Sequence, residues 1–167
     1  HAAGLNAALG AADGDYVLLV DNRNAKIQFR LSTLESLLLV ADRNPNAGMI
    51  YSDYLTISAE GGEKLVHLLD YHPGRLRDNM DFGAMLLFPN NVLNQIGGFN
   101  ESYNSAELYD LRLRVASAYE IVHIAAKVNG HAYIVHAASK SQNVFDYLMA
   151  GKEVQLEMEQ ALTEHLK

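Results

Sequence analysis

The sequence predicts an α/β fold in which a mixed sheet is flanked by helices. Two observations support this prediction. Short apolar runs typical of strands alternate along the chain with longer segments that repeat apolar residues every three or four positions, as helices do. The 167 residues are 49% hydrophobic and 20% charged, which is the composition of one globular domain with its own core.

The first third of the chain alternates helix, strand, helix and strand. Apolar residues at helical spacing predict a first helix over residues 2–12, which Gly14 ends. Residues 16–20 are all apolar and predict a strand that is buried on both faces of a parallel sheet. An apolar stripe predicts a second helix over residues 27–41, and residues 48–54 predict the next strand.

The rest of the chain continues this alternation with one long polar interruption. A glycine pair flanked by glutamates predicts a hairpin over residues 56–69, and the following charged segment, residues 71–81, predicts a loop. Residues 84–88 predict a strand that leads directly into a short helix. The remaining predicted elements are a helix over 105–117, strands over 120–124 and 132–135, and a helix over 153–166.

Charge and composition exclude several classes of partner. The chain carries 20 acidic and 13 basic residues, a net charge of −7 that repels a phosphate backbone, so we expect no nucleic-acid partner. No apolar run reaches the roughly 20 residues of a membrane span, so we expect no transmembrane segment in this chain. The chain has no cysteine, which fits a reducing compartment. We therefore expect a cytoplasmic protein, or one at the inner face of the membrane, in an undetermined oligomeric state.

Three stretches, taken together and in this order, resemble the family 2 glycosyltransferases. They are Gly4-Leu5-Asn6 with the strand run Gly14–Asp21, then Gly83–Phe88 with Gly97-Gly98-Phe99-Asn100-Glu101, and last the helical run Glu107–Arg114. The resemblance extends from residue 4 to about residue 125. It implies a fold of the GT-A type, a Rossmann-like mixed sheet in which a nucleotide-diphosphate sugar binds at the carboxyl ends of the strands.

The resemblance also implies how the chain is organised and what it does. Residues 1–145 would form part of a GT-A domain, and residues 146–167 a helical tail. The family's first, nucleotide-binding half would lie before His1, where we expect a strand that pairs with residues 16–20. The implied activity is transfer of a sugar, with inversion, from a nucleotide-diphosphate-sugar donor to a glycan or lipid-linked acceptor in polysaccharide or surface-glycan synthesis.

Donor-side residues would follow the first strand. The family places two acids there, which hold Mg²⁺ or Mn²⁺ against the donor's diphosphate. Here the sequence is Asp21-Asn22-Arg23, with arginine at the second acid position. The resemblance implies Asp21 as a metal ligand and Asp21, Asn22 and Arg23 as donor contacts, since a guanidinium pairs well with phosphate oxygens. Alternatively, Asp21 caps the next turn and Arg23 is a solvated charge, so a bound metal stays an open expectation.

A late histidine is the second metal-ligand candidate. The segment His136-Ala137-Ala138-Ser139-Lys140-Ser141 resembles the family's tail motif, in which a histidine can reach the metal. This similarity implies His136 as a metal ligand beside Asp21. The alternative is a histidine with an ordinary surface or core role.

The candidate base lies at the start of the helix that begins near residue 105. In the family an aspartate takes the proton from the acceptor hydroxyl. That position is Leu108 here, which shares an apolar helix face with Leu111 and Val115 and therefore reads as core. Glu107 becomes the candidate base and Asp110, on the same face as Glu107, the second catalytic candidate. The alternative for both acids is ion pairing on the helix surface.

Two other functions stay open at this point. The departures at Arg23 and Leu108 suggest a catalytically impaired module of the same fold, which would bind a glycan or scaffold a partner. A nucleotidyltransferase-like domain shares the sheet but would need a glycine-rich opening loop, which these residues lack and which could lie before His1.

Overall fold

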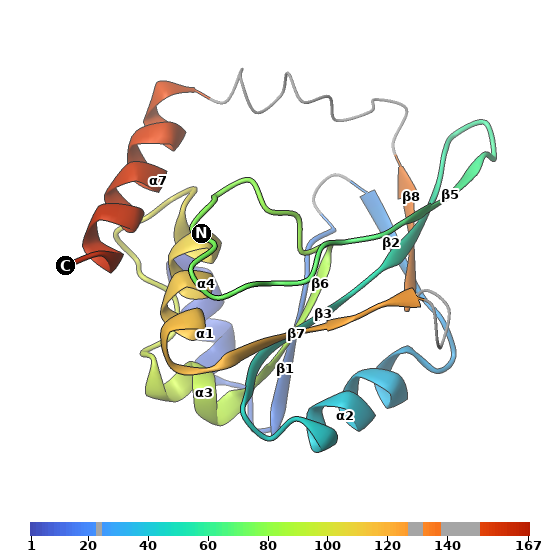
Figure 1. Ribbon diagram of the computed structural model, residues 1–167, viewed down its shortest axis with the longest axis horizontal. Helices are drawn as coiled ribbons and strands as arrows, with labels where there is room; N and C mark the ends of the chain where they lie inside the picture. Colours follow the sequence, from blue (N-terminus) through green and yellow to red (C-terminus); the bar gives the residue numbers. More distant parts are fainter. Residues whose placement is uncertain (23–24, 127–131, 138–150) are drawn as a thin grey trace.

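Helices and strands alternate along the chain in the computed structural model of the protein, which describes residues 1–22, 25–126, 132–137 and 151–167 (Figure 1). The helices are α1 (Ala2–Gly10), α2 (Thr33–Arg43), α3 (Asn90–Gln95), α4 (Glu107–Ala118) and α7 (Lys152–His165). The strands are β1 (Tyr16–Val20), β2 (Ala25–Phe29), β3 (Ala47–Ser52), β4 (Tyr54–Ile57), β5 (Glu63–Val66), β6 (Met85–Pro89), β7 (Glu120–Ile124) and β8 (Tyr133–Ala137). No helix within these ranges is both long and apolar enough to span a membrane.

The strands form two mixed sheets, which confirms the predicted α/β class. The first sheet has the order β1-β6-β3-β7, in which β6 runs antiparallel to both β1 and β3, and β3 runs parallel to β7. The second has the order β2-β8-β4-β5, in which β8 runs antiparallel to β2 and parallel to β4, while β4 and β5 form an antiparallel hairpin. This hairpin confirms the one predicted over residues 56–69, although it begins slightly earlier.

The first sheet separates two layers of helices. Alternate side chains of β3 point to opposite faces, so that Tyr51 packs toward α1, α3 and α4 while Ile50 packs toward α2. Figure 1 shows the same arrangement, with α2 on one side of the strands and the other helices gathered on the opposite side. Every residue of β3 is buried, as the centre of a core requires.

The prediction for β1 was partly wrong. Its bounds are those predicted, but its neighbour β6 is antiparallel, and in the described part of the chain β1 is the edge of its sheet. Val17 packs on the helical cluster with α1 and α4, and Leu18 packs on the cluster with α2. Both faces of the strand are therefore covered, which accounts for its uniformly apolar sequence. A uniformly apolar strand sequence indicates that both faces are buried, but it does not indicate whether the neighbouring strand is parallel or antiparallel.

The predicted helix over residues 27–41 was wrong at its beginning. Residues 25–29 form β2, which pairs with β8, and α2 begins only at Thr33. Ile27 and Leu31 suit helical spacing, but Leu31 is fully exposed in the turn between the two elements. The hydroxyl of the buried Thr33 accepts the N–H of Arg30 at 2.8 Å and donates to the carbonyl of Ala132, which fixes the helix start against β8.

The predicted strand over residues 48–54 is divided by Asp53. The chain leaves the first sheet at Ser52 and enters the second at Tyr54. Asp53 lies at the junction between the two sheets and is 1% exposed.

Helix α7 packs along α4 and caps its beginning. The two helices share a cluster of buried residues: Tyr103, Ala106, Tyr109, Leu113 and Ala161. Ala106 provides no side-chain cap for α4. Instead the carboxylate of Glu157 accepts the backbone N–H groups of Asn104, Ser105 and Ala106 at 3.0, 2.8 and 3.3 Å. These hydrogen bonds, that from Ser105 foremost, lower the pKa of the Glu157 carboxyl.

Candidate functional site

Three adjoining cavities lie where β1 ends, β6 begins and α4 begins. Asp21 lines cavities of about 280 and 150 Å³, and Glu107 lines the same 150 Å³ cavity together with one of about 390 Å³. Asp81 and Gly83, just before β6, line the 280 and 390 Å³ cavities. Asp21, the predicted donor-side acid, and Glu107, the predicted base, therefore lie in the wall of the same cavity, although they are far apart in the sequence.

Asp21 is positioned by the strand that it follows. Its backbone N–H donates to the carbonyl of Ala84 at 2.8 Å, which extends the pairing of β1 with β6 by one residue. Asn22, the second predicted donor contact, lines the 150 Å³ cavity beside Asp21. Arg23, the third, lies outside the described residues.

Glu107 is the first residue of α4 and is 5% exposed. Its Oε1 lies 2.8 Å from Nδ1 of His1, and its Oε2 is buried with no hydrogen-bond partner among the described residues. The positive end of the α4 dipole favours negative charge at this position.

His1 was not singled out from the sequence, because no motif surrounds it. Its contact with Glu107 joins α1 to α4 across the 150 Å³ cavity, which both residues line. Only the folded chain brings the two residues together.

Leu108 occupies the position of the family's usual base. It packs against the core cluster that contains Leu111 and Val115, as predicted, but it is only half-buried and also lines the 150 and 390 Å³ cavities. The alternative that Glu107 and Asp110 form ion pairs on the helix surface was wrong about their exposure, since both residues are buried whereas Leu108 is half-buried.

Asp110 is held in an ion pair. Its Oδ2 lies 2.5 Å from Nη2 and 2.9 Å from Nε of Arg114, whose Nη1 donates to the carbonyl of Ile96 at 2.7 Å. The pair fastens α4 to the end of α3. Asp110 is not among the described residues that line the three cavities. Its catalytic role stays a prediction.

His136 lies on β8 in the second sheet. Its Nε2 is 2.7 Å from Oε1 of Gln28 on the paired strand β2. Its neighbour Val135 lines the 280 Å³ cavity with Asp21, so the alternation of side chains along a strand directs His136 to the other face. The structure does not bring His136 and Asp21 together.

The described residues do not form a metal site on their own. No group of three or more histidine, aspartate or glutamate side chains in the described ranges is placed to hold a metal ion. At the end of β1 they offer one carboxylate and a neighbouring amide, whereas Mg²⁺ demands an octahedral set of oxygen ligands.

Gly83 is required by a close contact. Its φ is +75°, and a Cβ atom there would lie 2.2 Å from the hydroxyl oxygen of Tyr133. That hydroxyl accepts the N–H of Ala84 at 2.7 Å, and the Tyr133 ring stacks on Tyr54 at 5.3 Å. The hydroxyl of Tyr133 therefore fills the space beside Gly83 and fixes the entry into β6.

Two of the motifs that carry the resemblance are in contact. The side-chain amide of Asn6 donates to the carbonyl of Phe99 and to the carboxylate of Glu101, each at 2.9 Å, and its oxygen accepts the N–H of Phe99 at 2.9 Å. Gly98 has a φ of +68°, and a Cβ atom there would lie 2.8 Å from that oxygen. Gly98 therefore has a structural role, because it allows the close contact with Asn6 that fastens α1 to the segment before α4.

The sequence analysis did not predict the hydrogen-bond network around Asp53. Its Oδ1 accepts the N–H of Leu68 at 2.8 Å and lies 2.8 Å from Nε2 of His123, and its Oδ2 accepts the N–H of Ala126 at 3.0 Å and lies 2.9 Å from Nδ1 of His67. Burial alone would raise the pKa of Asp53, but these hydrogen bonds lower it to about 2. The partners are distant in the sequence, so no local spacing indicates them.

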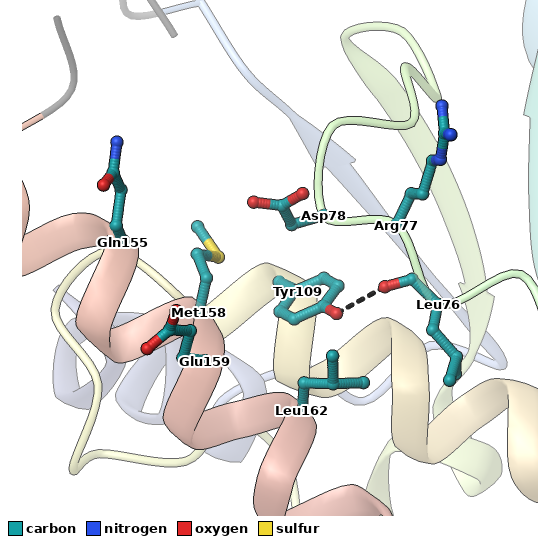
Figure 2. A pocket seen from close by; sticks show the side chains of 8 residues that line it. All are labelled: Leu76, Arg77, Asp78, Tyr109, Gln155, Met158, Glu159 and Leu162. Atoms are coloured by element: carbon teal, nitrogen blue, oxygen red, sulfur yellow. Dashed lines mark hydrogen bonds between the residues drawn. The ribbon is translucent and has the colours of Figure 1, made fainter. Parts of the chain in front are cut away.

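A further cavity, of about 540 Å³, lies between α7, α4 and residues 76–78. Figure 2 shows the carboxylate of Asp78 pointing toward Met158, the side chain of Arg77 turned away, and the hydroxyl of Tyr109 donating to the carbonyl of Leu76 at 2.5 Å. This cavity contains none of the predicted site residues. It lies mainly between α7 and the loop that precedes β6.

Comparison with known proteins supports the fold. The chain matches no family model and no curated protein sequence. It is similar to a solved structure of the mannosyltransferase PcManGT from Pyrobaculum calidifontis in complex with GDP-Man and Mn²⁺, with a TM-score of 0.53 and 17% sequence identity. The likeness covers 97% of this chain, which spans about half of that protein's length (49%). The chain therefore has a mixed α/β, glycosyltransferase-like fold.

Proposed function

We propose that the chain is part of a glycosyltransferase similar to family 2, which transfers a sugar from a nucleotide-diphosphate donor to a glycan or lipid-linked acceptor. One observation carries the proposal. Asp21, at the carboxyl end of β1, and Glu107, at the beginning of α4, line one cavity in a glycosyltransferase-like fold. The carboxyl ends of strands are where open α/β sheets bind their ligands.

The proposed reaction is an inverting displacement. An acceptor hydroxyl donates its hydrogen bond to the carboxylate of Glu107, which takes the proton as the acceptor oxygen attacks the anomeric carbon of the donor. The new carbon–oxygen bond forms on the face opposite the bond to the diphosphate, which breaks and leaves with its electron pair. Asp21, Asn22 and Arg23 contact the donor at its diphosphate end.

The main alternative is a non-catalytic module of the same fold. It is favoured by Leu108, whose half-buried side chain lines the cavities where the family's base would act. Such a module would bind a nucleotide sugar or a glycan at the same residues without turnover.

Calorimetric titration of the full-length protein with GDP-mannose and with UDP-sugars, with and without Mn²⁺, tests the proposal. We expect at least one nucleotide sugar to bind, and Asp21→Asn to weaken its affinity by about tenfold, which is about 1.4 kcal/mol. Asp13→Asn, at an exposed position after α1, is the matched control and should bind as the unaltered protein does. No binding of any nucleotide sugar under either condition would refute the proposed function.

A further inference from the structure

The backbone that leads into α4 is held by α7, which lies alongside α4 (Figure 1). Oε2 of Glu157 accepts the N–H groups of residues 104–106 at 3.0, 2.8 and 3.3 Å. Later in the same helix, Oε2 of Glu164 accepts the hydroxyl of Tyr103 at 2.7 Å. Every residue from 103 to 106 therefore donates a hydrogen bond to a carboxylate of α7, although the two segments are far apart in the sequence.

These hydrogen bonds fix the start of α4 from outside the helix. The N-cap residue, Ala106, has no side-chain oxygen and provides no cap of its own. Glu157 instead binds the N–H of Ala106 and those of the two residues before it, and its negative charge lies at the positive end of the α4 dipole. Charge-assisted hydrogen bonds are roughly twice as strong as neutral ones. We therefore expect the path of the chain into α4 to depend on Glu157.

Glu107 directly follows the segment that Glu157 holds. Its Oε1 lies 2.8 Å from Nδ1 of His1, whose side chain is 48% exposed, and its Oε2 has no hydrogen-bond partner among the described residues. Side-chain contacts therefore fix one oxygen of the carboxylate, through a half-exposed histidine. The position of the carboxylate consequently depends on the backbone that carries it. A displacement of about 1 Å can lower the rate of a catalysed step by up to about 10²-fold.

Helix α7 also contributes directly to the candidate site. Met158, the residue after Glu157, lines the 390 Å³ cavity together with Glu107, Asn104 and Ser105. One end of this cavity wall is thus built from the segment that Glu157 binds and from α7 itself. A displacement of α7 would therefore change both the wall of the cavity and the start of α4.

We propose that Glu157 is a positioning residue for Glu107, and that α7 thereby belongs to the catalytic unit of the chain. Glu157 contacts neither the donor nor the acceptor. It holds the backbone before α4 so that the carboxylate of Glu107 meets the acceptor hydroxyl. The inference rests on the proposed function, because it takes Glu107 as the base.

The test is a double-mutant cycle, measured as sugar transfer by the full-length protein. Glu157→Ala is expected to lower kcat by about 10- to 100-fold and to leave KM for the nucleotide sugar unchanged. Glu157→Gln keeps an oxygen that accepts N–H groups and should recover most of this loss. In a Glu107→Gln background, Glu157→Ala should change kcat by less than about twofold, because no base remains to be misplaced. Glu153→Ala, at an exposed position of the same helix, is the matched control and should keep full activity.

Two further measurements separate positioning from a general loss of stability. Thermal melts show whether each variant is folded, and hydrogen exchange should be faster at the N–H groups of residues 104–106 in Glu157→Ala but not in Glu153→Ala. If Glu157→Ala does not fold, Glu157→Asp, whose shorter side chain draws the oxygen back, completes the same cycle. Unchanged kcat in a folded variant, or an equal fall in kcat with and without Glu107, would overturn the inference and leave the proposed function standing. Absence of transfer by the unaltered protein would refute both.

Discussion

Replacing Asp53 by alanine is expected to lower the free energy of unfolding by about 3–5 kcal/mol. The carboxylate is 1% exposed and accepts two backbone N–H groups, from Leu68 and Ala126, besides contacting two histidines. Its removal leaves these groups without an acceptor at the junction of the two sheets. Urea unfolding followed by circular dichroism measures the change.

Asp70→Ala is the matched control for this prediction. Asp70 contacts the same histidine, His123, at 2.6 Å, but its side chain is 75% exposed. Exposed ion pairs contribute about 0–1 kcal/mol, so we expect a loss in that range. Equal losses for Asp53→Ala and Asp70→Ala would contradict the assignment of Asp53 as the centre of the network.

The same network predicts how stability depends on pH. The pKa of Asp53 is lowered in the folded protein from 3.8 to about 2, so between these values the unfolded chain binds more protons than the folded chain. Its contribution to stability is therefore complete above pH 3.8 and is lost as the pH falls toward about 2. Asp53→Asn should flatten the decline of stability over this interval relative to the unaltered protein.

Replacing Glu107 by glutamine is expected to lower kcat for sugar transfer by about 10²–10⁴-fold, the usual contribution of a general base. Glutamine has nearly the same shape and keeps an oxygen that can contact His1, so we expect the free energy of unfolding to change by less than about 1 kcal/mol. The measurement is transfer from a nucleotide sugar to a glycan acceptor by the full-length protein. Glu120→Gln, at an exposed position, is the matched control.

The possible results of this assay separate the two candidate functions. Full activity in Glu107→Gln would contradict the assignment of Glu107 as the base and would direct attention to Asp110. A protein that binds a nucleotide sugar but shows no turnover before any substitution would instead support the non-catalytic module.

Local patterns predicted most of the fold. The bounds of β1 and β7 are those predicted. For β1 the reason is plain, because it is a short apolar run between polar turns. Residues 25–29 were misassigned because two apolar residues four apart, Ile27 and Leu31, suit a helix. Their true environment is set by the pairing with β8, which is distant in the sequence. Tertiary contacts of this kind override local spacing.

The candidate site was predictable only in part. The resemblance implied Asp21 as a donor contact and Glu107 as the base, and both line the 150 Å³ cavity. The burial of Arg112, which lines the 390 Å³ cavity, was not predicted, because an arginine in an amphipathic helix usually faces solvent. Its burial depends on the loop that carries Arg77 and Phe82, and no local pattern in α4 encodes that contact.

A crystal structure of the full-length protein with a nucleotide-diphosphate sugar and a short neutral glycan tests the central claim most directly. The account predicts the diphosphate beside Asp21 and the terminal acceptor sugar beside Glu107, with its attacking hydroxyl directed at the carboxylate of Glu107. Binding of the nucleotide sugar in the 540 Å³ cavity beside α7, or of the glycan away from Glu107, would contradict it.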